Sequence, residues 1–144
     1  MRSGRAFTLV EILIVVVILG ILAAIVVPQF ASATKDASAG ATLDQLTKIR
    51  HALDVYYVRN GNVWPQVVAP SDGDWGELTL NNAGDYMRQP PKNMWVNPVN
   101  ALKIVPGTGP DTAYQSDYGW IYDAATGKVW AGAFDVNDKP FQVP

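Results

Sequence analysis

The chain opens with a long apolar run that predicts a membrane-spanning helix. From Leu9 to Val27 every residue is Ala, Val, Ile or Leu, except Glu11 and Gly20. At about 1.5 Å per residue, a helix over these 19 residues reaches roughly 28 Å, close to the ~30 Å hydrocarbon thickness of a bilayer. The run is therefore long enough to cross a membrane once.

Residues 30–58 continue the helical pattern, but with a single apolar face. Apolar and aromatic residues recur at helical spacing, with charged residues between them. The apolar positions are Leu43, Leu46, Ile49, Leu53 and Tyr56 or Tyr57. This face predicts packing against a head domain, and Asn60-Gly61 predicts the end of the helix. Pro28 lacks an N–H and predicts a kink.

The remainder of the chain is rich in turn residues and contains three strand-like segments. They are residues 101–105, 118–123 and 128–134. Residues 124–127, between the last two, are suited to a hairpin turn. We therefore expect an α+β fold in which a small antiparallel sheet packs on the second, amphipathic half of the long helix. A helix over residues 7–59 would extend roughly 80 Å, which predicts a lollipop-shaped molecule.

Composition argues against most enzyme chemistry. The chain has no cysteine and one histidine, His51, which excludes a disulfide or a cysteine-based zinc site and argues against a catalytic triad. No nucleophile and base stand out as a pair. The formal net charge is −2 and the basic residues are scattered, so no nucleic-acid partner is expected. These features predict a non-enzymatic role.

Charges on either side of the apolar run predict its orientation. Arg2, Arg5 and the initiator amine precede the run, whereas Lys35 and Asp36 cancel each other after it. The positive-inside rule therefore places Met1 in the cytoplasm and exports the C-terminal head.

Glu11 is the unusual residue of the run, because an ionised carboxylate near a bilayer core costs several kcal/mol unless it is paired or protonated. One interpretation is that Glu11 lies a turn inside the membrane edge and snorkels to the cytoplasmic headgroups. The other is that it has a dedicated partner. The carboxylate alone leaves both interpretations open.

The residues around Glu11 form a motif. The segment Ala6-Phe7-Thr8-Leu9-Val10-Glu11-Ile12-Leu13-Ile14-Val15 resembles the prepilin cleavage and methylation motif of the type IV pilin and pseudopilin family. Gly20, a following Ile/Leu/Ala run and Pro28 continue the resemblance. It implies that a prepilin peptidase and methyltransferase cuts between Ala6 and Phe7 and methylates the new amine of Phe7. Ala6 departs from the glycine that is usual in the family at that position.

The resemblance also implies a division of the chain into three parts. They are a leader peptide (residues 1–6), the transmembrane and assembly half of the helix (7–28), and an extracytoplasmic pilin-like head that includes the second half of the helix (29–144). Glu11 is then placed to neutralise the Phe7 amine of a neighbouring subunit, in a helix bundle whose low dielectric makes an unpaired charge costly. Gly20 and Pro28 would loosen the helix during assembly.

One segment of the head indicates which machine uses the subunit. Trp95-Val96-Asn97-Pro98 is similar to the Trp-Gly-Asn-Pro segment of major pseudopilins from type II secretion systems. We therefore expect a structural subunit of a type IV-like filament, most like a type II secretion pseudopilin, with a type IV pilus subunit as the alternative. The implied partners are copies of itself, other pilin-like subunits and an inner-membrane assembly platform. The expected location is the bacterial inner membrane with the head in the periplasm, and then a filament in the periplasm or at the cell surface.

Near the C-terminus, Asp135, Asn137 and Asp138 supply hard oxygen ligands at short spacing, which could hold calcium. The similar pseudopilins have a calcium loop in this region, but that loop is not clearly present here. We expect a solvated loop and no cofactor, with calcium as the one candidate.

Two further interpretations use the same residues. Ala31-Ser32-Ala33 fits a cleavage site that would release a soluble protein, although Glu11 and the length of the apolar run oppose an ordinary secretory signal. The head could also be a secreted or membrane-tethered binding domain whose aromatic residues contact carbohydrate or peptide. Otherwise the five tryptophans are expected to fill the core or the edges of the head: Trp64, Trp75, Trp95, Trp120 and Trp130.

Overall fold

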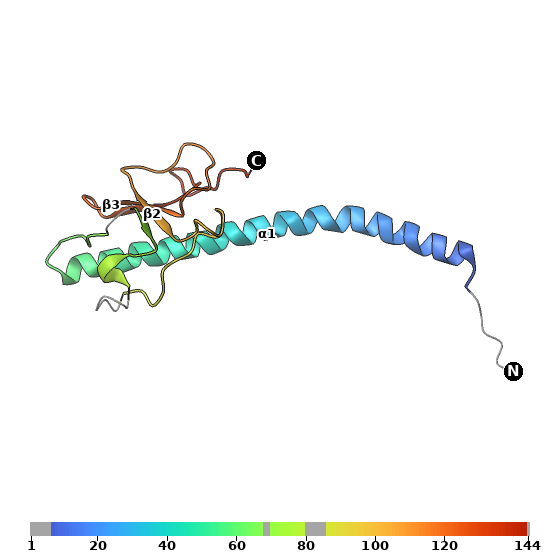
Figure 1. Ribbon diagram of the computed structural model, residues 1–144, viewed down its shortest axis with the longest axis horizontal. Coiled ribbons are helices and arrows are strands. Elements are labelled where there is room, and N and C mark those ends of the chain that lie inside the picture. Colours follow the sequence, from blue (N-terminus) through green and yellow to red (C-terminus); the bar gives the residue numbers. More distant parts are fainter. Residues whose placement is uncertain (1–6, 68–69, 80–85, 144) are drawn as a thin grey trace. The chain divides into compact units, whose positions relative to one another are not determined.

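The computed structural model describes residues 7–67, 70–79 and 86–143 (Figure 1). Its elements, in chain order, are helix α1 (Leu9–Arg59), strand β1 (Ser71–Asp72), the 3₁₀-helix η1 (Gly76–Leu78) and strands β2 (Lys103–Pro106), β3 (Trp120–Asp123) and β4 (Lys128–Ala131). The chain divides into two compact units, Met1–Asp36 and Ala37–Pro144. A long helix followed by a small sheet confirms the α+β class predicted from the sequence.

In the first unit, residues 9–36 belong to α1 and are exposed along their whole length. The large aliphatic side chains between Leu9 and Val27 are 41% to 82% exposed, and they lie on all sides of the helix. By length and composition, α1 can cross a membrane. The helix continues through Pro28 without interruption, although this residue cannot donate a helical hydrogen bond.

In the second unit, α1 buries one face in the core of the head. The buried residues recur mainly three or four positions apart, as in an amphipathic helix. They are Thr42, Leu46, Ile49, Ala52, Leu53 and Tyr56. The helix ends where the sequence predicts: Gly61 adopts a φ of +67°, and the N–H of Asn62 donates to the carbonyl oxygen of Tyr57 at 2.9 Å. This is a Schellman-type C-terminal cap.

The four strands form one sheet in the order β1-β2-β3-β4. β3 and β4 pair antiparallel, with Ile121 opposite Trp130, which confirms the predicted hairpin. β1 also pairs antiparallel with β2. β2 and β3, however, pair parallel, with Val105 opposite Ile121. The sheet is therefore mixed, and the antiparallel arrangement expected from the sequence holds for two of its three pairings.

The parallel pairing follows from the connection between β2 and β3. Residues 107–119 return the chain to the end of the sheet at which β2 begins, so that β3 runs in the same direction as β2. A parallel pair needs a connection of about this length. At the end of the crossover the Gly119 N–H donates to the carbonyl oxygen of Lys103 at 2.9 Å. A side chain could not fit there, because a Cβ on Gly119 would lie 2.3 Å from the carbonyl oxygen of Ala101.

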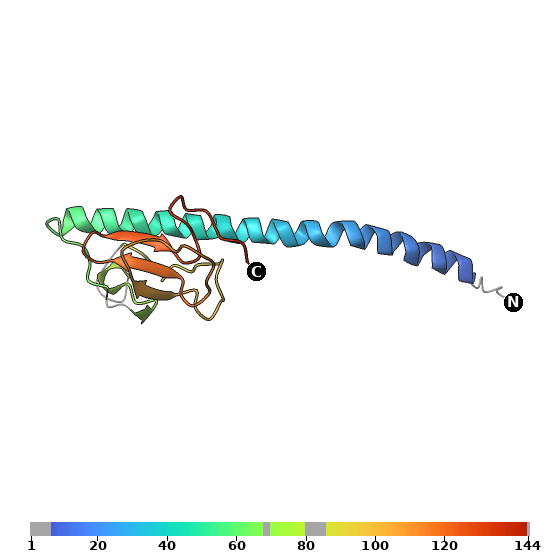
Figure 2. The ribbon, with the colours of Figure 1, turned by 90° about the horizontal axis from the view of Figure 1, so that it is seen from above.

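One face of the sheet and the buried face of α1 form the core of the head; the strands lie alongside the second half of the helix (Figure 2). Alternate residues of β3 and β4 belong to this core, as the twofold period of a strand requires. They are Trp120 and Tyr122 on β3, and Val129 and Ala131 on β4. Leu46 and Ile49 of α1 belong to the same cluster.

The tryptophans fill the core and the edges of the head, as predicted. Trp75, Trp95 and Trp120 are buried, whereas Trp64 and Trp130 are half-buried. The indole N–H of Trp120 donates to the carbonyl oxygen of Pro91 at 2.9 Å, and that of Trp95 donates to the carbonyl oxygen of Phe141 at 3.0 Å. These hydrogen bonds satisfy two buried donors and fix two loops against the core.

Asn93 is a fully buried polar residue between α1 and the sheet. Its Nδ2 donates to the carbonyl oxygens of Gly119 at 2.8 Å and Gly132 at 3.0 Å. Its Oδ1 accepts the N–H of Trp95 at 2.8 Å and lies 3.2 Å from the hydroxyl of Thr42 on α1. The side-chain amide thus uses both donors and both acceptor positions, and it connects segments far apart in the sequence.

We predict that Asn93→Ala lowers the free energy of unfolding of the head by about 2–4 kcal/mol, because it removes the buried hydrogen bonds of Asn93 to the carbonyl oxygens of Gly119 and Gly132 and to the N–H of Trp95. Urea unfolding of the full chain in detergent, followed by tryptophan fluorescence, measures this loss. Lys92→Ala, at the exposed neighbouring position, is the control and should change stability by less than about 0.5 kcal/mol. Equal losses in the two variants would contradict the role of the buried amide.

Candidate functional site

The candidate site is the start of α1, where Thr8 and Glu11 exchange hydrogen bonds and so cap the helix. The N–H and the hydroxyl of Thr8 each donate to Oε2 of Glu11 at 2.8 Å. In return, the N–H of Glu11 donates to the hydroxyl oxygen of Thr8 at 3.2 Å. This reciprocal arrangement is a capping box, which satisfies N–H groups that have no partner in the first helical turn.

The capping box holds the Glu11 carboxylate at the N-terminal end of α1. The helix dipole favours a negative charge at this end. Within the described part of the chain, the second carboxylate oxygen, Oε1, accepts no hydrogen bond, so it is open to a donor from outside. Thr8 was not among the residues predicted for the site. Its signal was the Thr-x-x-Glu spacing before an apolar run, which is the sequence signature of a capping box.

The other residues predicted for this site lie along the same segment. Phe7 lies two residues before the first residue of α1 and is 80% exposed. Its partner in the predicted cleavage, Ala6, lies outside the described residues. A Cβ added to Gly20 would meet no atom within 4 Å, so packing within the chain does not require glycine there. Pro28 lies inside α1 and is also exposed. The structure thus brings Phe7 close to the capping box and leaves Gly20 and Pro28 further along the helix.

The surface that follows the cap is aliphatic on all sides. From Ile12 to Val27, every residue is exposed. Burying one such side chain is worth about 1.5–3 kcal/mol, and soluble monomers rarely leave an apolar surface of this size in water. The segment therefore needs hydrocarbon or neighbouring apolar helices around it.

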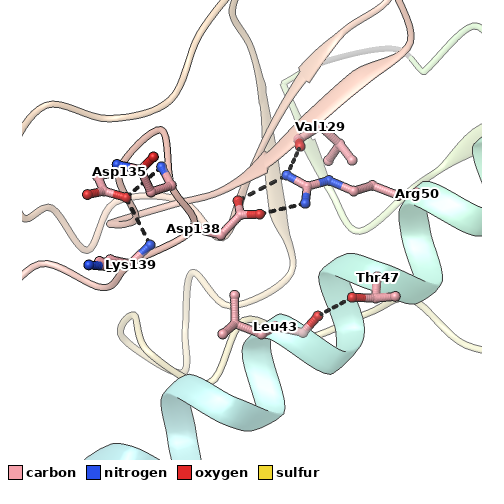
Figure 3. Close-up of polar contacts among 8 residues, drawn as sticks. Leu43, Thr47, Arg50, Val129, Asp135, Asp138 and Lys139 are labelled. Atoms are coloured by element: carbon pink, nitrogen blue, oxygen red, sulfur yellow. Dashed lines mark hydrogen bonds and ion pairs between the residues drawn. The ribbon is translucent and has the colours of Figure 1, made fainter.

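The calcium candidates lie in the loop after β4 (Figure 3). The Asp138 carboxylate pairs with Arg50 of α1 at 2.6 Å. Oδ1 of Asp135 accepts the N–H groups of Lys139 at 2.9 Å and Asn137 at 2.8 Å. These hydrogen bonds, with that from Lys139 foremost, hold the pKa of Asp135 below its ordinary value. Among the described residues, no group of three or more His, Cys, Asp or Glu side chains is placed to hold a metal ion.

A groove of about 510 Å³ on the head contains the two half-buried tryptophans and bears on the binding-domain interpretation. Trp64 stacks on Tyr57, with ring centroids 4.1 Å apart. The hairpin turn also lies against this ring, because a Cβ on Gly127 would come within 2.2 Å of it. Trp64 is therefore held between α1 and the hairpin, which gives it a structural role.

Comparisons with known proteins found a family model that matches the N-terminal segment and several relatives that share one name. Residues 1–27 match the family model described as the prokaryotic N-terminal methylation motif. The chain is 37% identical to the type II secretion system core protein G of Pseudomonas aeruginosa, over 78% of this chain and 82% of the relative. It is 31% identical to the protein of that name from Aeromonas hydrophila, over 70% and 74%, and 33% identical to that from Vibrio cholerae, over 67% and 69%. No solved structure matched the chain.

Thr8→Val tests the capping box, because it removes the hydroxyl with little change of shape. We expect the amide hydrogen of Glu11 to exchange about 2- to 30-fold faster, since an N-cap contributes about 0.5–2 kcal/mol. NMR of the full chain in detergent micelles measures the exchange. Thr8→Ser keeps the hydroxyl and should exchange at the wild-type rate. If Thr8→Val also exchanged at that rate, the capping box would not hold the helix start.

Proposed function

Because the chain belongs to the type II secretion system core protein G family, we propose that it is a pseudopilin, a structural subunit that polymerises into the filament of a protein-secretion machine. The observation that carries the proposal is the exposed aliphatic segment of α1, which begins at the Thr8–Glu11 cap and lies within the residues that match the methylation motif. Its relatives are named as core proteins of secretion systems, which supports a structural rather than an enzymatic role.

We propose that maturation removes residues 1–6 by a cut between Ala6 and Phe7, followed by methylation of the Phe7 amine. The match to the methylation motif supports this assignment. Phe7 is also exposed and precedes the first residue of α1, so its backbone is outside helical hydrogen bonding. The enzyme that performs both steps would be a prepilin peptidase and methyltransferase. The mature chain would then consist of the assembly segment 7–28 and the head 29–144.

In the assembled filament, Glu11 would neutralise the Phe7 amine of a neighbouring subunit. An ammonium and a carboxylate in a low-dielectric helix bundle are costly apart and tolerated together, which makes the pairing selective for register. The capping box supports this role, because it fixes Glu11 through Oε2 and leaves Oε1 open. Thr8 would thus act as a positioning residue for the carboxylate.

Before assembly, the subunit would be anchored in the bacterial inner membrane by α1, with its N-terminus in the cytoplasm and its head in the periplasm. The length and apolar composition of α1 support the anchor. An inner-membrane assembly platform would then move subunits into a filament together with other pilin-like proteins. Gly20 and Pro28 would ease this transfer by weakening the helix between its two ends.

Intact-mass analysis of the chain extracted from membranes tests the maturation step. We expect the mass of residues 7–144 plus one methyl group, and N-terminal sequencing should give methylated Phe7. A chain that begins at Thr34 would indicate an ordinary secreted protein. A chain that keeps Met1 would indicate an unprocessed anchor, and either result would contradict the proposed maturation.

Glu11→Ala tests the assembly role. The variant should enter the membrane and be cleaved normally, but filament yield in sheared fractions should fall at least about tenfold, because the neighbour's ammonium loses its partner in the bundle. Asp36→Ala, an exposed acidic position on the same helix, is the matched control and should assemble normally. Normal filaments from Glu11→Ala would remove the charge pair from the mechanism.

A further inference from the structure

We propose that the guanidinium group of Arg50 is the cation that fixes the C-terminal loop, residues 135–139, in place of the calcium ion that Asp135, Asn137 and Asp138 suggest in the sequence. This inference goes beyond the proposed function, because it concerns what holds the head together. Its test therefore does not depend on filament assembly.

The first argument is the geometry of Arg50 (Figure 3). Nη1 donates to Oδ2 of Asp138 at 2.6 Å, and Nη2 donates to Oδ1 of the same carboxylate at 3.0 Å. Nη2 also donates to the carbonyl oxygen of Val129 on β4 at 3.2 Å. The two parallel hydrogen bonds to one carboxylate are the strongest form of ion pair that arginine makes. One side chain of α1 thus holds both β4 and the loop that follows it.

The second argument is that the candidate ligands do not fit a calcium ion. Calcium takes six to eight oxygen ligands, most of them supplied by carboxylates and carbonyl groups. Both oxygens of Asp138 already accept hydrogen bonds from Arg50, and Oδ1 of Asp135 is occupied by two backbone N–H groups. A divalent ion on Asp138 would also lie beside the positive charge of Arg50, and the two cations would repel each other.

The third argument is that the loop closes on itself without a metal. The N–H of Asp135 donates to the carbonyl oxygen of Lys139 at 2.9 Å, and the N–H of Asp138 donates to that of Asp135 at 3.1 Å. Asp138 adopts a φ of +57°, a conformation that Asp and Asn tolerate better than most residues. The loop is therefore a closed turn, and the guanidinium group of Arg50 ties it to α1.

Thermal unfolding of the full chain in detergent, followed by tryptophan fluorescence, tests the proposal. The wild-type midpoint should be the same, to within about 1 °C, in excess EDTA and in millimolar calcium chloride. Arg50→Gln should lower the midpoint by about 3–8 °C in both solutions, because it removes a bidentate charged pair. Asp138→Asn should lower it by a similar amount, since asparagine keeps the backbone conformation and loses the charge. The double variant should fall no further than the larger single loss.

Lys48→Gln is the matched control. Lys48 lies on the same helix and pairs with Asp44 at 2.6 Å, but both side chains are about 60% exposed, and we expect a change below about 1–2 °C. A wild-type midpoint that rises with calcium or falls with EDTA would overturn the proposal. Equal shifts for Arg50→Gln and Lys48→Gln would overturn it too. If Arg50→Gln did not fold, the calcium comparison on the wild type and Asp138→Asn would still decide the question.

Discussion

The head depends on one buried side-chain amide where the helix meets the sheet. Apolar contacts such as those of Leu46 and Trp120 supply most of the stabilising free energy, but they are non-directional and tolerate small shifts. Asn93 is directional: its partners are carbonyl groups at the start of β3 and after β4, an N–H in its own loop and a hydroxyl on α1. A shift of any of these segments would leave a polar group unpaired in the core, which is costly at low dielectric. The amide therefore determines which residues face one another.

The first unit differs from the head, because the side chains of residues 9–36 are exposed and not buried in a core. The backbone hydrogen bonds of its described residues lie within α1 and in the capping box of Thr8 and Glu11, as suits a segment in hydrocarbon. Its large aliphatic side chains, by contrast, are exposed. One part of the chain thus folds around its own core, while the other acquires its packing only from lipid or from other helices. A family of filament subunits needs both properties in one chain.

Local patterns predicted the local parts of the structure. The spacing of apolar residues around Leu46 and Leu53 marked the buried face of α1, Asn60-Gly61 marked its end, and the turn residues before Lys128 marked the hairpin. The parallel pairing of β2 with β3 depends on the path of a long crossover, which no short pattern encodes. Arg50 and Asp138 are 88 positions apart, and either residue alone resembles an ordinary surface charge. Thr8 is different, because its spacing from Glu11 was visible in the sequence.

The pairing of Arg50 with Asp138 has a consequence for how the head responds to its surroundings. A counter-ion carried on the chain is present at a fixed effective concentration, whereas the occupancy of a metal site follows the concentration of free metal outside. The loop is then closed when the head folds, whatever the concentration of free metal around the protein. Since the two side chains are 42% and 30% exposed, salt in the surrounding solution still screens this contact.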